Sequence, residues 1–160
     1  MSTRVGIGFD AHPLTEGRQL VLAGVTIRWP KGLAGQSDGD VLTHAAIDAI
    51  LGGSGQGDIG THFPSNDRQY KNASGATLMA KTIRIVGQSG WRTQYLDATI
   101  IAETPVLTPY VESIRAGLAG SMGVDTNQVS IKATSTNTLG FIGRSDGIAA
   151  IAVATLESLE

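Results

Sequence analysis

The sequence predicts an α+β fold in which a mixed β-sheet carries helices packed on one face. Stretches rich in β-branched and aromatic residues alternate with stretches whose apolar residues recur at helical spacing. The chain of 160 residues suits a single domain with a usable core, and it shows no repeat or linker. Strands and helices that alternate in this way within one domain are typical of a sheet covered by helices.

The first 30 residues are predicted to form three strands. Residues 3–9 are typical of a strand that leads into Asp10-Ala11-His12. Residues 19–22 and 25–29 fit a strand pair, because Ala23-Gly24 between them allows a tight turn. These segments should contribute the first strands of the fold.

A helix is expected to follow this region. The side chain of Asp40 can accept hydrogen bonds from free backbone amides at its start, and Gly52-Gly53 should end it near Leu51. His44 then lies in the first turns, with Asp40 and Asp48 four residues before and after it on one helical face. Either carboxylate could orient the His44 imidazole, although Asp40 could equally be only a cap.

The rest of the chain is predicted to begin with a long loop. Residues 55–74 are rich in glycine and polar residues, and the length of this segment suggests a lid over a binding site. The same criteria then predict a helix over 74–89, a strand over 95–102, a helix over 110–122 and a strand over 129–135. The final run, residues 147–156, alternates weakly and is rich in alanine, so strand and helix are not distinguished there.

The composition limits the partners of the chain. Charged residues make up 16% of the sequence against about 25% in typical proteins, which suggests that partner subunits of a homo-oligomer cover part of the surface. A net charge of -2 without a basic run argues against binding to nucleic acid. The longest apolar run is about half the roughly 20 residues that a membrane span requires. Strand-like sequence close to Met1 leaves no room for a signal peptide, so we expect a cytoplasmic protein without a membrane segment.

Asp10, His12 and His44 are the candidate metal ligands. The chain has three histidines and no cysteine, so few residues could form a transition-metal site. In a strand, Asp10 and His12 would project from the same face about 7 Å apart, close enough to share one ion. With His44 they would make three protein ligands, as in catalytic zinc sites that keep one position open. Asp10 could instead simply orient the His12 imidazole.

Five motifs in order resemble the 2-C-methyl-D-erythritol 2,4-cyclodiphosphate synthase family of the non-mevalonate isoprenoid pathway. They occupy residues 6–12, residues 37–40 with His44, residues 57–60 with Phe63-Pro64, residues 97–102 with Pro105, and residues 132–136 with 139–144. Together they span nearly the whole chain.

The resemblance implies a homotrimer with active sites at the subunit interfaces and a zinc ion held by Asp10, His12 and His44. It also implies a lyase reaction. The 2-phosphate of 4-diphosphocytidyl-2-C-methyl-D-erythritol 2-phosphate attacks the β-phosphorus of its own cytidine diphosphate arm, forming 2-C-methyl-D-erythritol 2,4-cyclodiphosphate and releasing CMP. Because the nucleophile belongs to the substrate, the protein mainly positions the substrate and neutralises its charge, and no general base is required.

The resemblance also assigns roles to individual residues. Ser37 would donate to a phosphate, Asp58 and Gly60 would contact the erythritol hydroxyls, and Phe63 would lie on a mobile loop. Ser37, Asp58 and Ser135 are the expected catalytic residues. The expected substrate-binding residues are Asp10, His12, Gln36, Ser37, Asp58, Ile59, Gly60, Phe63, Ala102, Pro105, Val106, Leu107, Ala133, Thr134, Ser135, Asn137, Phe141 and Arg144. Asp58 could instead be only a turn residue, Thr134 and Ser135 could be ordinary strand residues, and His62 is expected to be peripheral.

Three positions depart from the family pattern. Asn137 stands where the family usually has a glutamate that binds a second divalent ion, Mg²⁺ or Mn²⁺, so that ion is expected to depend on the substrate phosphates. Gln36 and Val106 replace a histidine and a lysine of some members, which removes positive charge near a polyanionic substrate. Lys132 is one residue that could compensate.

Phe141 and Arg144 correspond to a region that, in the family, lines a cavity on the trimer axis. An isoprenoid diphosphate could sit there, with Arg144 binding the diphosphate. Arg144 could equally be structural, satisfying a turn or a subunit contact.

Two other functions compete with the lyase. A zinc hydrolase would need a nearby acid/base group that no motif identifies. A catalytically impaired trimer that binds nucleotides or isoprenoid diphosphates through its metal would explain the three departures from the family pattern.

Overall fold

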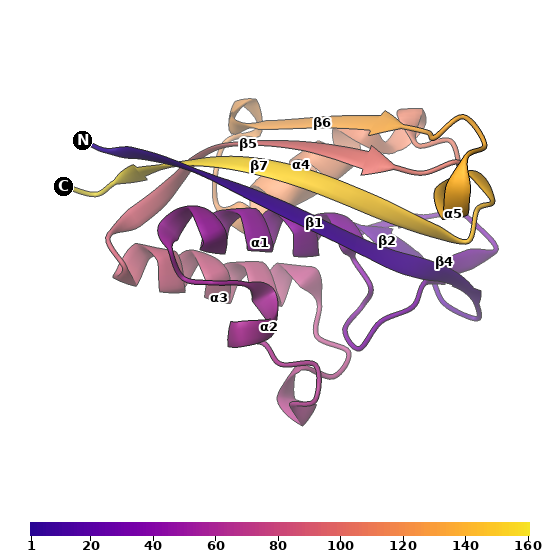
Figure 1. Ribbon diagram of the computed structural model, residues 1–160, viewed down its shortest axis with the longest axis horizontal. Helices are drawn as coiled ribbons and strands as arrows, with labels where there is room; N and C mark the ends of the chain where they lie inside the picture. Colours follow the sequence, from indigo (N-terminus) through magenta and orange to yellow (C-terminus); the bar gives the residue numbers. More distant parts are fainter.

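The computed structural model, which describes all 160 residues, contains a five-stranded mixed sheet with the order β4-β1-β7-β5-β6 (Figure 1). Strands β1 and β5 each pair antiparallel with β7, whereas β5 and β6 pair parallel. A separate antiparallel pair is formed by β2 and β3. The strands are β1 (Thr3–Glu16), β2 (Leu20–Leu22), β3 (Val25–Ile27), β4 (Lys31–Leu33), β5 (Trp91–Ile101), β6 (Val129–Thr134) and β7 (Gly147–Ser158).

Three long helices pack against the sheet and against one another to build the core. They are α1 (Val41–Ser54), α3 (Gly75–Gln88) and α4 (Val111–Met122). Figure 1 shows α1 and α3 on one side of the sheet, with α1 along β1 and β7. The short helices are α2 (Ile59–His62) and α5 (Gly140–Gly143). None of the helices is long and apolar enough to cross a membrane. The predicted α+β class with a mixed sheet is confirmed.

Two glycines of β1 allow α1 to pack directly on the strand backbone. A Cβ atom at Gly6 would lie 1.9 Å from the Ala49 carbonyl oxygen, and one at Gly8 would lie 2.0 Å from the Ala45 carbonyl oxygen. Asp10 and His12 continue the same face of β1, because alternate residues of a strand point the same way. The close packing therefore brings the two predicted ligands of β1 next to the first turns of α1, where His44 lies.

Helix α1 is longer than its sequence suggests, so the prediction that Gly52-Gly53 ends it is wrong. The helix continues to Ser54 and ends at Gly55, which adopts the left-handed conformation with φ of 78°. Gly53 is instead a packing residue, since a Cβ atom there would lie 2.5 Å from Leu156 Cδ1.

Other differences from prediction involve elements with weak local sequence patterns. Residues 147–156, which were ambiguous, form most of β7, and β1 extends through His12 to Glu16. Strand β4 and helix α5 were not predicted, and each has only three or four residues. The predicted loop over residues 55–74 contains α2 and a 3-10 turn at Arg68–Tyr70, so it is more ordered than expected.

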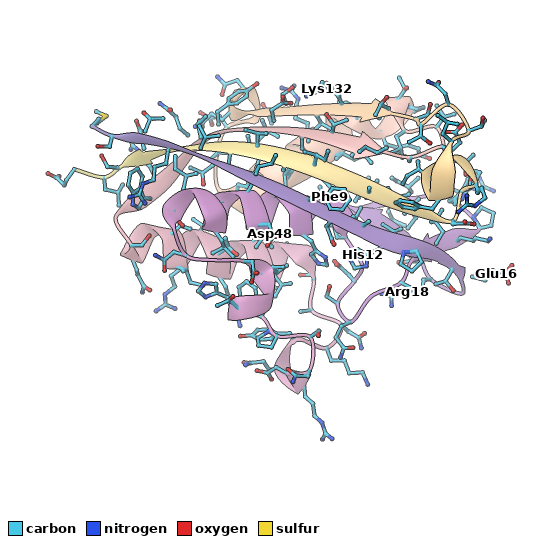
Figure 2. All side chains as sticks on the ribbon, viewed as in Figure 1. Phe9, His12, Glu16, Arg18, Asp48 and Lys132 are labelled. Carbon is cyan, nitrogen blue, oxygen red and sulfur yellow. The ribbon has the colours of Figure 1, made fainter.

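The sheet face opposite α1 exposes an apolar patch. Its residues are Val5, Ile7, Phe9, Tyr95, Ile151 and Val153, from the three central strands. Ile7, which is 72% exposed, stands opposite Val153, and Phe9 stands opposite Ile151 (Figure 2 labels Phe9). A contiguous apolar surface of this kind is typical of a subunit contact.

Candidate metal centre and adjoining pockets

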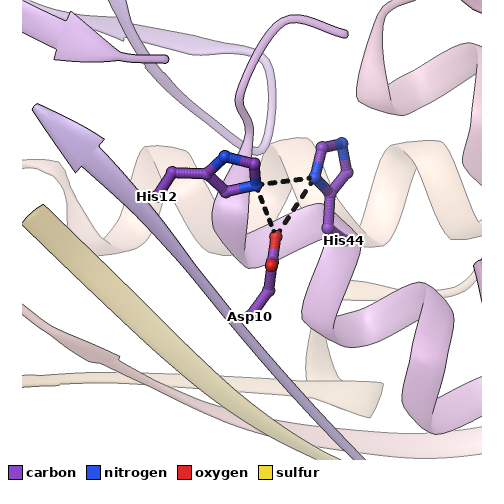
Figure 3. A group of neighbouring side chains, drawn as sticks. All are labelled: Asp10, His12 and His44. Atoms are coloured by element: carbon purple, nitrogen blue, oxygen red, sulfur yellow. Dashed lines mark hydrogen bonds and ion pairs between the residues drawn. The ribbon is translucent and has the colours of Figure 1, made fainter. Parts of the chain in front are cut away.

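Asp10, His12 and His44 converge as the sequence predicted (Figure 3). Asp10 Oδ2 lies 2.8 Å from His12 Nε2 and 3.2 Å from His44 Nδ1, and the two ring nitrogens are 3.4 Å apart. Ligand atoms around a tetrahedral zinc ion, at about 2.0–2.1 Å from the metal, are separated by roughly 3.3 Å. The three atoms are therefore spaced as zinc ligands would be.

Hydrogen bonds around the two imidazoles orient their ring nitrogens toward Asp10. His12 Nδ1 donates to the Ala34 carbonyl oxygen at 2.6 Å, so Nε2 is the ring nitrogen that faces Asp10 and that would bind a metal ion once it has lost its proton. Burial by itself would raise the pKa of Asp10, but the hydrogen bonds with His12 and His44 outweigh it and lower that pKa to about 2. One carboxylate and two imidazoles are a suitable ligand set for zinc, so the chemistry of the residues fits the expected ion.

Neither aspartate on α1 orients the His44 imidazole, so that part of the prediction is wrong. Asp40 caps α1 by accepting from the Thr43 backbone N–H, which is the alternative role. Asp48 accepts from the Ile59 N–H at 2.7 Å and so connects α1 to the start of α2. The side chain that meets His44 Nε2 is Ser37, whose Oγ lies 3.0 Å away on the segment before α1.

The metal group opens into a cavity of about 250 Å³. The residues that line it are Asp10, His12, Gln36, Ser37, His44, Ile59, Gly60, Phe63, Ser65, Tyr70 and Leu78. The lining therefore combines the metal ligands and the polar side chains of Gln36 and Ser37 with apolar and aromatic side chains from residues 59–78. Phe63 is buried and packs edge-on against Tyr70 with the ring centroids 5.2 Å apart. This cavity is called the metal pocket below.

A second, separate pocket lies at the ends of β5 and β6. Its lining residues are Ala102, Glu103, Pro105, Val106, Leu107, Thr108, Ala133, Thr134 and Ser135. Seven of the expected substrate-binding residues are in this list, namely Ala102, Pro105, Val106, Leu107, Ala133, Thr134 and Ser135. It is called the strand-end pocket below.

Comparison with known proteins places this geometry in a family. The sequence profile that describes the YgbB family matches residues 3–157 of this chain, a range that includes both pockets. The chain belongs to the YgbB family. Relatives named 2-C-methyl-D-erythritol 2,4-cyclodiphosphate synthase from Enterococcus faecalis and Geobacillus kaustophilus are each 51% identical over 154 residues, covering 96% of this chain and 98% of theirs. The family resemblance stated from the motifs is confirmed.

Solved structures support the same assignment. The bifunctional IspDF from Campylobacter jejuni superposes with a TM-score of 0.94 at 38% identity, and the match covers 98% of this chain and 42% of that longer chain. IspF from Plasmodium falciparum, solved as a CDP complex, superposes with a TM-score of 0.86 at 28% identity, over 99% of this chain and 98% of that one. The arrangement of the sheet and helices is thus shared with YgbB-family structures.

Several residues expected from the family pattern lie outside both pockets. Asp58 caps α2 by accepting from the backbone N–H and the hydroxyl of Thr61, which also lower its pKa. Asn137 lies beyond the strand-end pocket in a turn with φ of 54°. Phe141 is exposed, and Arg144 pairs with Asp146 through Nε–Oδ2 at 3.0 Å. The roles of these residues toward substrate or ligand stay predictions.

The structure also locates His62 and the residues that were expected to change the charge of the pockets. His62 is peripheral to both pockets, with its Nε2 donating to the Gln56 carbonyl oxygen at 2.6 Å. Val106 is 72% exposed in the strand-end pocket, and Gln36 is exposed in the metal pocket. Both side chains are neutral, so neither pocket has a positive charge at the position where some family members carry one. Lys132 pairs with Asp97 and lines neither pocket, so it does not replace the lost charge.

Sequence reasoning missed part of the metal pocket. Tyr70 comes from the 3-10 turn, and its only local signal was an aromatic residue within a polar segment. Leu78 belongs to the apolar stripe of α3 and was assigned to the core, where it also packs. Ser65 had no distinguishing pattern. These residues reach the pocket because α3 and the preceding segment fold back toward α1.

Proposed function

We infer that the chain catalyses the 2-C-methyl-D-erythritol 2,4-cyclodiphosphate synthase reaction of non-mevalonate isoprenoid biosynthesis. It is a lyase that cyclises 4-diphosphocytidyl-2-C-methyl-D-erythritol 2-phosphate and releases CMP. The observation that carries this conclusion is the Asp10–His12–His44 group in a chain about half identical to synthases over nearly its full length.

The pocket residues suit a reaction whose nucleophile is a phosphate of the substrate. Zinc, when bound by Asp10 Oδ2, His12 Nε2 and His44 Nδ1, would act as a Lewis acid toward phosphoryl oxygens. Ser37, beside His44, places a hydroxyl donor next to the metal ligands, and Phe63 adds apolar surface to the same pocket. The protein thus binds and orients both phosphate arms, and no side chain is needed to take a proton from the nucleophile.

Each active site is proposed to form between two subunits of a homotrimer. Within one chain the metal pocket and the strand-end pocket are separate cavities, whereas the substrate joins a sugar phosphate to a cytidine diphosphate. The exposed apolar face around Ile7 supplies a surface for association. The strand-end pocket of one subunit would therefore complete the metal pocket of its neighbour. Light scattering coupled to size-exclusion chromatography should give the mass of three chains of 16.6 kDa.

A second divalent ion, Mg²⁺ or Mn²⁺, is proposed near Asn137 and is expected to need the substrate phosphates. The Asn137 amide offers a neutral oxygen, whereas Mg²⁺ usually binds through one or two carboxylates plus phosphates. Titration calorimetry should therefore detect Mg²⁺ binding in the presence of CDP but only weak binding to the free enzyme. Tight binding without CDP would overturn this assignment.

An isoprenoid diphosphate on the trimer axis is the proposal for Phe141 and Arg144. Both side chains are exposed, and the Arg144–Asp146 pair is on the surface of the single chain. Native mass spectrometry of the purified trimer should detect a bound isoprenoid diphosphate. Its absence would leave Arg144 with the structural role. The expected cytoplasmic location also stays a prediction.

One assay separates the synthase from its alternatives. The protein is incubated with the diphosphocytidyl substrate, Zn²⁺ and Mg²⁺, and the products are followed by phosphorus NMR. CMP together with a cyclic diphosphate supports the synthase, and inorganic phosphate would indicate a hydrolase. Tight binding without turnover would indicate the catalytically impaired binding trimer. A His44→Ala variant that stays trimeric should lose both zinc and turnover.

A further inference from the structure

Arg18 is hydrogen-bonded to the backbone of the segment that contributes Gln36 and Ser37 to the metal pocket (Figure 2 labels Arg18 and His12). It stands between the end of β1 and the start of β2, and its side chain is partly buried. Its guanidinium donates from Nη1 to the Gly35 carbonyl oxygen at 3.0 Å and from Nη2 to the Ser37 carbonyl oxygen at 2.9 Å. Arg18 takes part in no ion pair, so these two backbone carbonyl oxygens are its hydrogen-bond acceptors.

The Gln36 carbonyl, which lies between the Gly35 and Ser37 carbonyls in sequence, is bound by a different residue. The Gln36 carbonyl oxygen accepts from the Asn72 backbone N–H at 3.1 Å, and the Asp38 N–H donates to the Ala73 carbonyl oxygen at 3.2 Å. Three successive carbonyls are therefore satisfied, two by Arg18 and one by Asn72. The two bonds from Arg18 are charge-assisted and come from a planar fork, so they restrain the segment strongly.

The segment held in this way contacts both predicted histidine ligands. The Ala34 carbonyl oxygen accepts from His12 Nδ1, and Gly35 packs so closely that a Cβ atom there would lie 3.0 Å from His12 Cε1. At the other end, Ser37 Oγ lies 3.0 Å from His44 Nε2. Movement of residues 34–37 would consequently displace the Ser37 hydroxyl and the Gln36 side chain from the pocket wall.

We propose that Arg18 is a positioning residue for the cyclisation reaction, holding residues 35–37 so that Ser37 and Gln36 face the substrate phosphates. The proposal rests on the synthase function, because it concerns how the same pocket receives phosphate groups.

The test compares Arg18→Met, which keeps much of the aliphatic stem but removes both donors and the charge, with Arg84→Met as a matched control. Arg84 is exposed on α3, takes part in no hydrogen bond or ion pair and lines neither pocket. R18M should lower kcat/KM for CMP release by about 10- to 100-fold, while R84M stays within about twofold of wild type. R18K keeps the charge but lacks the fork, and it should lose about tenfold.

A double-mutant cycle asks whether Arg18 acts through the segment it holds. Adding R18M to an enzyme that carries both Ser37→Ala and Gln36→Ala, treated as one perturbation, should lower kcat/KM by no more than about threefold further, because both positioned side chains are already absent. Losses that multiply in full, or an R18K enzyme equal to wild type, would overturn the positioning role. If R18M does not fold, the same cycle with R18K decides.

Hydrogen exchange gives a readout that does not depend on turnover. In the zinc-loaded enzyme without substrate, the amides of Asp38 and Asn72, whose hydrogen bonds join this segment to residues 72–73, should exchange at least about tenfold faster in R18M than in wild type or R84M. Unchanged exchange would overturn the proposal even if activity fell. Failure of the synthase function itself would be seen separately, as a wild-type enzyme that releases no CMP.

Discussion

Replacing Gly8 with alanine tests how closely β1 must pack on α1 to form the metal site. The new Cβ atom would lie 2.0 Å from the Ala45 carbonyl oxygen and 2.7 Å from the Ala49 amide nitrogen. Ordinary van der Waals contact begins at 3.4 Å, so the helix would have to retreat by roughly 1.4 Å at this point. Backbone atoms cannot rotate away as a side chain can, so the cost should lie near the upper end of the usual range, about 3 kcal/mol.

The same retreat should damage the metal site. His44 precedes Ala45 on α1, whereas Asp10 and His12 lie on β1, so a displaced helix separates one ligand from the other two. Functional groups generally need to be held to within about 0.5 Å. Gly8→Ala should therefore weaken zinc binding at least about tenfold and lower Tm by about 6–12 °C.

Zinc affinity by competition with a chelator and thermal unfolding of the metal-free protein measure the two effects separately. Gly52→Ala is the control, because Gly52 lies on the same helix and a Cβ atom there would meet nothing within 4 Å. That variant should keep zinc and gain about 0.5–1 kcal/mol of stability. A G8A protein with wild-type zinc affinity and a Tm within about 2 °C of wild type would refute the close-packing argument.

Three further substitutions test other parts of the structure. Asp48→Ala removes the acceptor for the Ile59 N–H, so it should cost about 1 kcal/mol in thermal unfolding and raise KM for CMP release; an unchanged KM would separate α2 from substrate binding. Ile7→Glu places a carboxylate on the exposed apolar face and should shift the trimer to monomers in light scattering; a persistent trimer would show that this face is not the interface. Asn137→Glu should strengthen Mg²⁺ binding to the free enzyme about tenfold by calorimetry, and an unchanged affinity would place the second ion elsewhere.

Much of the fold was predictable because several elements have clear local patterns. The apolar residues from Leu78 to Val86 repeat at helical spacing, and they do form α3. Asp40 was predicted as a cap from its position before an apolar run, and it accepts from the Thr43 N–H. The shortest elements were not predicted, because three or four residues carry too little periodicity to distinguish a strand or helix from a turn.

The sequence alone predicted that Asp10 and His12 would share one face if the strand of residues 3–9 continued through them, and its order of motifs identified the family. Only the tertiary structure decided that residues 147–156 are a strand, because β7 gains hydrogen bonds from β1 on one side and from β5 on the other. It likewise decided that Ser37, not an α1 aspartate, meets His44, and that Arg18 holds the Ser37 segment. Periodicity reports the geometry of a continuous stretch of chain, whereas these contacts join distant segments and depend on how the helices pack on the sheet.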